Sequence, residues 1–306
     1  MSSEGSTRAI LAALLANAGI AVAKFVGFLI TGSSSMLAES VHSVADTSNQ
    51  GLLLLGQRAS RKRPDPLHQF GYGRSRFFYS FVVALVLFTL GSVFAIYEGY
   101  HKISHPEELT SPTVAIAILI VAICLEGYSF RTAVKESRPL KGRRSWWWFI
   151  RVSRNPELPV VLLEDSGALV GLLFALIGVG LTILTGNPAW DGVGSIGIGL
   201  LLGVIAVVLM IETHSLLIGE GATGDEERAI RAALEQTDNI DRVIHLRTQY
   251  LGPEQMLVGA KIAVPPSTGL ATVAATIDAA EAAIREAVPT ADLIYLEPDL
   301  DRASRT

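Results

Sequence analysis

Long, predominantly apolar runs with few charged residues constrain this chain more than any other feature of its sequence. An α-helix needs about 20 predominantly apolar residues to cross the hydrocarbon core of a bilayer. Six runs of that kind occur, at about 9–30, 36–56, 77–99, 112–130, 158–184 and 192–214. A mean hydropathy of +0.41 over the whole chain also excludes an ordinary soluble domain. The sequence therefore predicts an α-helical membrane protein with six transmembrane helices.

Positive charge alternates between the loops that join these runs. Lys and Arg are concentrated in the second loop, at about 57–76, and in the fourth, at about 131–157, whereas the short loops near 31–35 and 185–191 have none. By the positive-inside rule the second and fourth loops are cytoplasmic, and so are both termini. Met1–Arg8 leads directly into the first run without a cleavage site or an organellar targeting segment. We therefore expect a multi-pass protein of the cell (plasma or inner) membrane.

The last part of the chain has the composition of a small soluble domain. Thr223-Gly224-Asp225-Glu226 is typical of a capped helix start. Alternating apolar residues then predict one half-buried strand with Ile244, Leu246, Thr248 and Tyr250 facing inward, and a second at 258–264. A helix from about 270 to 284 and a strand at 293–296 follow. We expect a membrane domain at 1–217 and a cytoplasmic α+β domain at 218–306 that pairs subunits or senses a signal.

Ionisable residues inside the apolar runs are the candidates for function, because they are expensive to keep in a membrane. His42 and Asp46 are four residues apart and share one helix face. Asp165 lies about 13–15 Å along a helix from the cytoplasmic end of its run, at a depth similar to that of Asp46. One imidazole with carboxylate oxygens suits Zn²⁺, Fe²⁺, Co²⁺ or Mn²⁺ and is a poor site for Cu(I). Cys124 is the single cysteine, so no thiolate cluster is available.

A structural interpretation stands beside the functional one. A lone polar side chain within a membrane helix often only hydrogen-bonds a neighbouring helix. We interpret five residues of the apolar runs in that way: Asn17, Lys24, Asn49, Gln50 and Glu126. From the residues alone, the same interpretation also stays open for the set of His42, Asp46 and Asp165.

Several motifs together resemble the cation diffusion facilitator family of metal/proton antiporters. They are Asn17 and Lys24 in the first run, Gly32-Ser33, the stretch from Glu39 to Asp46, His68-Gln69-Phe70-Gly71-Tyr72-Gly73-Arg74, and the helix–strand–strand–helix–strand order of the tail. The resemblance implies six spans, a cytoplasmic ferredoxin-like domain and a homodimer in the lipid bilayer. It also implies a transport site with two residues from the second span and two from the fifth.

The fifth span departs from the family pattern. The family usually has His-x-x-x-Asp there as well, but Val161 occupies the histidine position four residues before Asp165. Glu164 precedes Asp165 instead, as in the branch of the family that contains mitochondrial zinc transport proteins. Glu164 lies about 100° around the helix from Asp165, so it is a tentative fourth ligand, a proton acceptor or a packing residue.

The resemblance and the residues together predict an exporter of a divalent metal cation, with zinc preferred, in exchange for protons. Its metal ligands would be His42, Asp46 and Asp165, with Glu164 as the tentative addition. A membrane metal sensor or scaffold that does not transport is the alternative, favoured by the missing histidine. An intramembrane enzyme is a weaker one, because the His-x₃-Asp spacing is one residue short of the acyltransferase pattern and no nucleophile accompanies it. His245 is expected to face solvent on its strand.

Overall fold

The computed structural model describes residues 18–106 and 108–300. It forms two compact units, one containing the residues up to Gln57 and Phe78–Thr213, the other Arg58–Phe77 and the residues from His214 onward. Asn17 and the start of the predicted first span lie outside the described residues. The helices α2 (Ser34–Ser60) and α3 (Ser75–Val86) run continuously across the boundary between the units.

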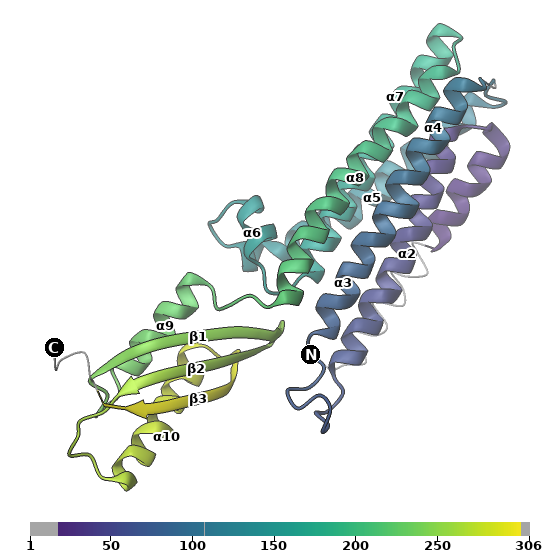
Figure 1. Cartoon of the computed structure of the whole chain (residues 1–306). Helices are drawn as coiled ribbons and strands as arrows, with labels where there is room; N and C mark the ends of the chain where they lie inside the picture. The colour runs from purple at the N-terminus through teal and green to yellow at the C-terminus, as the bar shows by residue number, and fades with distance from the viewer. Residues whose placement is uncertain (1–17, 107, 301–306) are drawn as a thin grey trace. The chain divides into compact units, whose positions relative to one another are not determined.

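The first unit consists of helices that run roughly side by side (Figure 1). After the helix Ala18–Thr31 and α2, its elements are α3, the π-helical segment η1 (Leu87–Val93), α4 (Phe94–Ser104), α5 (Pro112–Lys141), α6 (Trp146–Val152), α7 (Glu157–Thr185) and α8 (Ala189–Ile218). The segments α3, η1 and α4 form one rod. Small buried residues let these helices approach closely around an apolar core that includes Leu87, Leu172 and Leu202.

Four helices within the described residues are long and apolar enough to cross a membrane: Ser75–Ser104, Thr113–Lys141, Glu157–Thr185 and Ala189–Ile218. The other two predicted spans do not reach that standard. The described part of the first, Ala18–Thr31, is short, and the second, α2, is long but buries polar residues such as Glu39, His42 and Asn49. All four apolar helices are longer than the predicted runs, because the helical conformation continues into the residues that flank each run.

The glycines of α8 allow its close packing on the rod of η1 and α4. A Cβ atom at Gly199 would lie 2.8 Å from the carbonyl oxygen of Ser92, and one at Gly203 would lie 2.7 Å from the Ser92 Oγ. Real Cβ atoms do not approach backbone so closely, so a larger residue at Gly199 would push the helices apart, whereas one at Gly203 would require the Ser92 hydroxyl to move. The small-xxx-small pattern of α8 therefore marks a helix–helix contact, as such patterns do in membrane proteins.

The buried carboxylate of Asp191, at the start of α8, caps the N-terminus of α2. Its Oδ1 accepts from the Ser33 hydroxyl at 2.8 Å and from the Ser35 N–H at 3.3 Å. Its Oδ2 accepts from the Ser34 N–H at 2.7 Å and from the Ser34 hydroxyl at 3.2 Å. The first N–H groups of a helix have no partner within the helix. Asp191 supplies one from another helix and so fixes where α2 begins.

The second unit has the element order that the sequence predicts. The helix α9 (Gly224–Glu235) begins with the capping box of Thr223, and β1 (Arg242–Gly252), β2 (Gln255–Ala263), α10 (Leu270–Ala287) and β3 (Ala291–Asp299) follow. The sheet order is β1-β2-β3, with β1 antiparallel and β3 parallel to β2. Alternate residues of β2 are buried against α9 and α10, which pack on one face of the sheet (Figure 1).

One register prediction in β1 is wrong. Val243 pairs with Ile262 and His245 with Lys261, so Ile244 is an extra residue without a partner. Such a bulge shifts the residues before it to the other face of the strand. Val243 is therefore buried where Ile244 was expected, while Leu246 and Tyr250 face the core as predicted and His245 is exposed.

The segment between α2 and α3 packs on the turn between β1 and β2. A Cβ atom at Gly73 would lie 2.6 Å from the carbonyl oxygen of Leu251, and Phe77 is fully buried in the core of this unit. Within the segment the Tyr72 hydroxyl donates to Asp65 Oδ2 at 2.6 Å. That hydrogen bond holds the pKa of the Asp65 carboxyl below its usual range. Gly73 and Tyr72 of the motif around Phe70 thus have structural roles.

Candidate metal site

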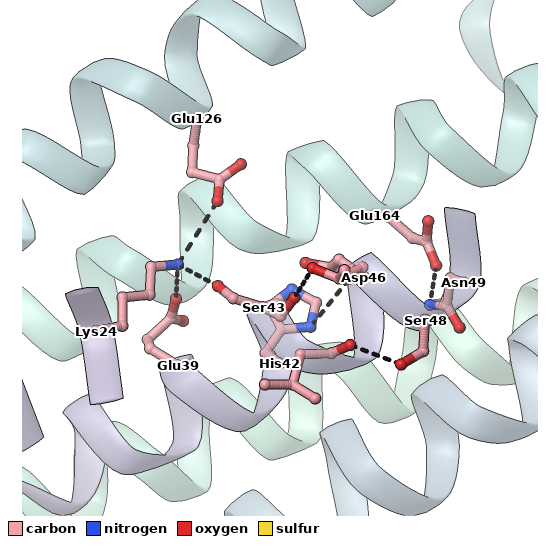
Figure 2. A network of polar contacts seen from close by, with 11 residues as sticks. Lys24, Glu39, His42, Ser43, Asp46, Ser48, Asn49, Glu126 and Glu164 are labelled. Atoms are coloured by element: carbon pink, nitrogen blue, oxygen red, sulfur yellow. Dashed lines mark hydrogen bonds and ion pairs between the residues drawn. The ribbon is translucent and has the colours of Figure 1, made fainter. Parts of the chain in front are cut away.

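The polar residues of α2 gather on one face because they recur every three or four residues. Glu39, His42, Asp46 and Asn49 follow this spacing within a continuous helix. His42 is buried, and its Nδ1 lies 3.5 Å from Oδ1 of Asp46, whose side chain is 17% exposed (Figure 2). The pair predicted from the sequence is therefore formed. A distance of 3.5 Å is an ion-pair distance and longer than a good hydrogen bond.

Helix α7 supplies the other two predicted residues. Glu164 is buried, and its Oε1 accepts a hydrogen bond from Asn49 of α2 at 2.6 Å (Figure 2). Asp165 Oδ2 accepts one from the Ser129 hydroxyl of α5 at 3.0 Å. The adjacent carboxylates therefore point to different neighbouring helices. Asn49 has the helix-bridging role that the sequence predicts.

A small cavity brings three of the four predicted residues together. Its volume is about 20 Å³, and its wall contains Asp46, Glu164 and Asp165 together with Glu126, Gln50 and Val161. A volume of that size accommodates about one water molecule. His42 is not part of the wall but lies directly behind Asp46. Val161 presents an apolar surface where the resemblance leads one to expect an imidazole.

Several buried polar atoms of α2 have no hydrogen-bond partner among the residues that the structure describes. They are both ring nitrogens of His42, Asp46 Oδ1, Asn49 Oδ1, Gln50 Oε1 and Glu39 Oε1. Nearly all buried polar groups in proteins are paired, so a group of unpaired polar atoms on one helix calls for an explanation. A cation entering the cavity would provide one, since a neutral imidazole nitrogen and carboxylate oxygens are its natural ligands.

The site is not a closed ligand shell. Within residues 18–106 and 108–300, no group of three or more His, Cys, Asp or Glu side chains is already close enough together to hold a metal ion. Asp46, Glu164 and Asp165 share the cavity, while two of them hold hydrogen bonds to Asn49 and Ser129. Small side-chain rotations would be needed to turn their oxygens onto one ion.

Lys24 organises a second polar group beside this cavity. Its ammonium donates to Glu39 Oε2 at 3.1 Å and to the Ser43 hydroxyl at 2.9 Å, and it pairs with Glu126 Oε1 at 3.5 Å (Figure 2). This agrees with the bonding between helices predicted for Lys24. Glu126 likewise contacts a neighbouring helix as expected, through this ion pair, and in addition it lines the cavity together with Gln50.

The position of Glu126 is the feature that sequence reasoning missed. The available signal was a carboxylate in an otherwise apolar run. Such a residue is energetically expensive to bury in a membrane, so its presence indicates a function or a partner but does not say which. Its membership of the cavity depends on the packing of α5 against α7, and that packing has no local sequence pattern.

Two family models match this chain. One, described as the cation efflux transmembrane domain, matches residues 10–218, which is more than half of the chain. The other, described as the cation efflux protein cytoplasmic domain, matches residues 222–299.

Individual relatives give the same picture. The chain is 34% identical over 252 residues to the proton-coupled zinc antiporter SLC30A9, mitochondrial, of Homo sapiens, which covers 81% of this chain and 44% of that protein. It is 31% identical to metal tolerance protein C4 of Arabidopsis thaliana, with 84% and 57% of the two chains covered. It is 24% identical to zinc transporter ZitB of Pectobacterium atrosepticum, with 86% and 77% covered. The chain thus spans less than half of the length of the mitochondrial relative.

Proposed function

Because the chain belongs to the cation efflux family, we propose that it is a secondary transporter that exports a divalent metal cation in exchange for protons. Zinc is the proposed cargo, since two of the relatives are named as zinc transport proteins. Manganese is the nearest competitor, because MneP of Bacillus subtilis, 22% identical to this chain, is named as a manganese efflux system protein. An enzyme is excluded by the family, which is one of transporters.

The chain is a multi-pass membrane protein, and we propose six spans for it. The helices Ala18–Thr31 and α2 would be the two spans that lack the apolar character of the other four. Their polar residues would face the cavity and the Lys24 group instead of lipid, which is where ionisable groups are tolerated in membranes. Both termini and the domain 218–306 would lie on the cytoplasmic side, and the membrane would be the cell membrane.

The C-terminal domain would pair two copies of the chain. Its helix–strand–strand–helix–strand order and mixed three-stranded sheet support a ferredoxin-like module. The described residues of this module contain no group of three or more His, Cys, Asp or Glu side chains placed to hold a metal ion. A homodimer built through this domain, with residues 1–217 as the transport domain, is the arrangement we propose.

The cavity is the observation that carries the proposed function. It collects carboxylates from α2 and α7 beside a buried imidazole whose two nitrogens are unpaired. We propose His42, Asp46 and Asp165 as metal ligands and Glu164 as a fourth, once it releases Asn49. Metal binding requires a neutral imidazole and ionised carboxylates, so protons compete with the cation for the same lone pairs. That competition would couple the two fluxes, while the helix bundle exposes the site to each side in turn.

Metal uptake into proteoliposomes with an imposed pH gradient tests this proposal. Zn²⁺, Fe²⁺, Co²⁺ and Mn²⁺ would be compared in wild type, Asp46→Ala, Asp165→Ala and Glu164→Ala, with Glu136→Ala on the exposed face of α5 as the control. We expect zinc flux that depends on the gradient, is lost in the Asp46 and Asp165 variants, and is retained in the control. Loss in Glu164→Ala would make that residue a ligand.

A metal sensor or scaffold that does not transport is the second candidate. Val161 in the wall of the cavity favours it, because the site lacks the second imidazole expected from the resemblance. Zinc binding without flux of any of the four metals would overturn the transporter proposal and support the sensor.

A further inference from the structure

Lys24 shares its ammonium group unequally among three partners. Ser43 at 2.9 Å and Glu39 at 3.1 Å are hydrogen-bonded to Nζ, whereas Glu126 at 3.5 Å is held only as an ion pair. Lys24 and Glu39 are both fully buried, and Glu126 is 13% exposed. Glu126 is therefore the partner with the longest contact to Lys24 and the one that is ion-paired with Nζ instead of hydrogen-bonded to it, so it is the less tightly held of the two carboxylates.

Glu126 also faces the metal cavity. It is one of the four carboxylates in the wall, and it comes from α5, whereas Asp46 comes from α2 and Glu164 and Asp165 come from α7. Its charge repels those of Asp46 and Asp165. Lys24 approaches only one oxygen of Glu126, so the second remains available to a cation in the cavity.

The balance of charge around the cavity favours a cation as a partner for Glu126. Four carboxylates line the cavity and no Lys or Arg among the described residues does. Like charges gathered in a medium of low dielectric repel strongly. Lys24 offsets part of this repulsion, while Asp46 Oδ1 and the two His42 nitrogens have no hydrogen-bond partner among the described residues and could therefore accept a further positive charge.

We propose that Glu126 is a further metal-facing carboxylate of the transport site and that Lys24 is its positioning residue. This inference rests on the proposed function and adds a ligand from a third helix. Lys24 holds Glu126 at the edge of the cavity, and the carboxylate turns to the divalent cation when one enters. Glu126 then supplies from α5 the coordination that Val161 cannot supply from α7. The resulting set of one imidazole and several carboxylates suits a borderline or hard divalent ion.

Zinc titration of the purified full-length protein in detergent tests the assignment. The variants are Glu126→Gln, the matched control Glu136→Gln on the exposed face of the same helix, and the double variant Lys24→Gln/Glu126→Gln. Lys24→Gln keeps an N–H donor for the buried Glu39 while removing the charge. Size-exclusion profiles confirm that each variant stays folded. We expect Glu126→Gln to weaken zinc binding by at least about tenfold and the control to bind like wild type.

The double variant separates a ligand from a structural ion pair. If Glu126 faces the metal, the double variant stays as weak as Glu126→Gln. If Glu126 only balances Lys24, removing both charges restores wild-type affinity and overturns the inference. If Glu126→Gln binds zinc as tightly as wild type while Asp165→Asn does not, the role of Glu126 is overturned and the proposed function stands. If the wild-type protein binds no zinc, both the proposed function and the role of Glu126 are overturned.

Discussion

The cap that Asp191 places on α2 makes a quantitative prediction about stability. The substitution Asp191→Asn keeps one acceptor oxygen but replaces the other with an amide that can only donate. The carboxylate accepts four hydrogen bonds from Ser33, Ser34 and Ser35, so the variant leaves about two buried donors unpaired. Hydrogen bonds between membrane helices average about 0.6 kcal/mol, and those to charged groups contribute about 1.5–3 kcal/mol. For two such hydrogen bonds the expected loss is therefore about 1–6 kcal/mol.

Thermal unfolding in detergent, followed by tryptophan fluorescence, measures this loss. At an unfolding entropy of about 2.1 cal/mol/K per residue, a chain of 306 residues shifts its Tm by roughly 1.5 °C per kcal/mol, so we expect a decrease of roughly 2–9 °C. Membrane proteins often unfold irreversibly, so all variants must be compared at one scan rate. Asp278→Asn, at an exposed position of α10, is the matched control. A shift for Asp191→Asn no larger than that of the control would refute the capping role.

Three further predictions concern the second unit. Gly73→Val should loosen the segment that precedes α3, because a Cβ atom there would lie 2.6 Å from the Leu251 carbonyl oxygen. Faster proteolysis between α2 and α3 would show this loosening, and an unchanged cleavage pattern would contradict the contact. Thr223→Ala should cost about 1 kcal/mol and speed amide exchange in the first turn of α9, since it removes the N-cap; equal exchange would mean that the capping box adds no stability. The hydrogen bond to Glu297 raises the pKa of Lys261 in the folded protein. The charged Lys261 should therefore stabilise the fold below the ordinary lysine pKa of about 10.4, and this stabilisation should be lost as the pH rises through the raised pKa of the folded protein. The unfolding temperatures of wild type and Lys261→Met should then become equal only above the raised pKa of Lys261. Equal unfolding temperatures already near neutral pH would contradict this prediction.

Local patterns in the sequence were enough to predict much of the fold. The capping box of α9 and the alternation of β2 involve residues close together in the chain, and both are formed as predicted. The bulge at Ile244 was missed because one extra residue keeps the strand apolar while it changes which side chains face inward. The run 36–56 was predicted as a span from its length and its apolar residues, but the helix α2 that contains it is less apolar than the four long helices because it buries several polar side chains.

The candidate site could be predicted only where its residues share a helix. The pairing of His42 with Asp46 follows from their spacing, and the structure forms it. The place of Glu126 at the cavity and the cap by Asp191 depend on helices that are distant in sequence. A single carboxylate in an apolar run indicates that it has a partner but does not say which one.

Movement of protons driven by a zinc gradient tests the central claim most directly. Proteoliposomes would hold wild-type protein and a trapped pH indicator, with equal pH on both sides and zinc added outside. If zinc and protons compete for Asp46 and Asp165, zinc entry should drive protons out and make the interior alkaline, and Asp165→Asn should abolish both movements. Zinc entry without a change in internal pH, or a pH change that persists in Asp165→Asn, would contradict antiport at this site.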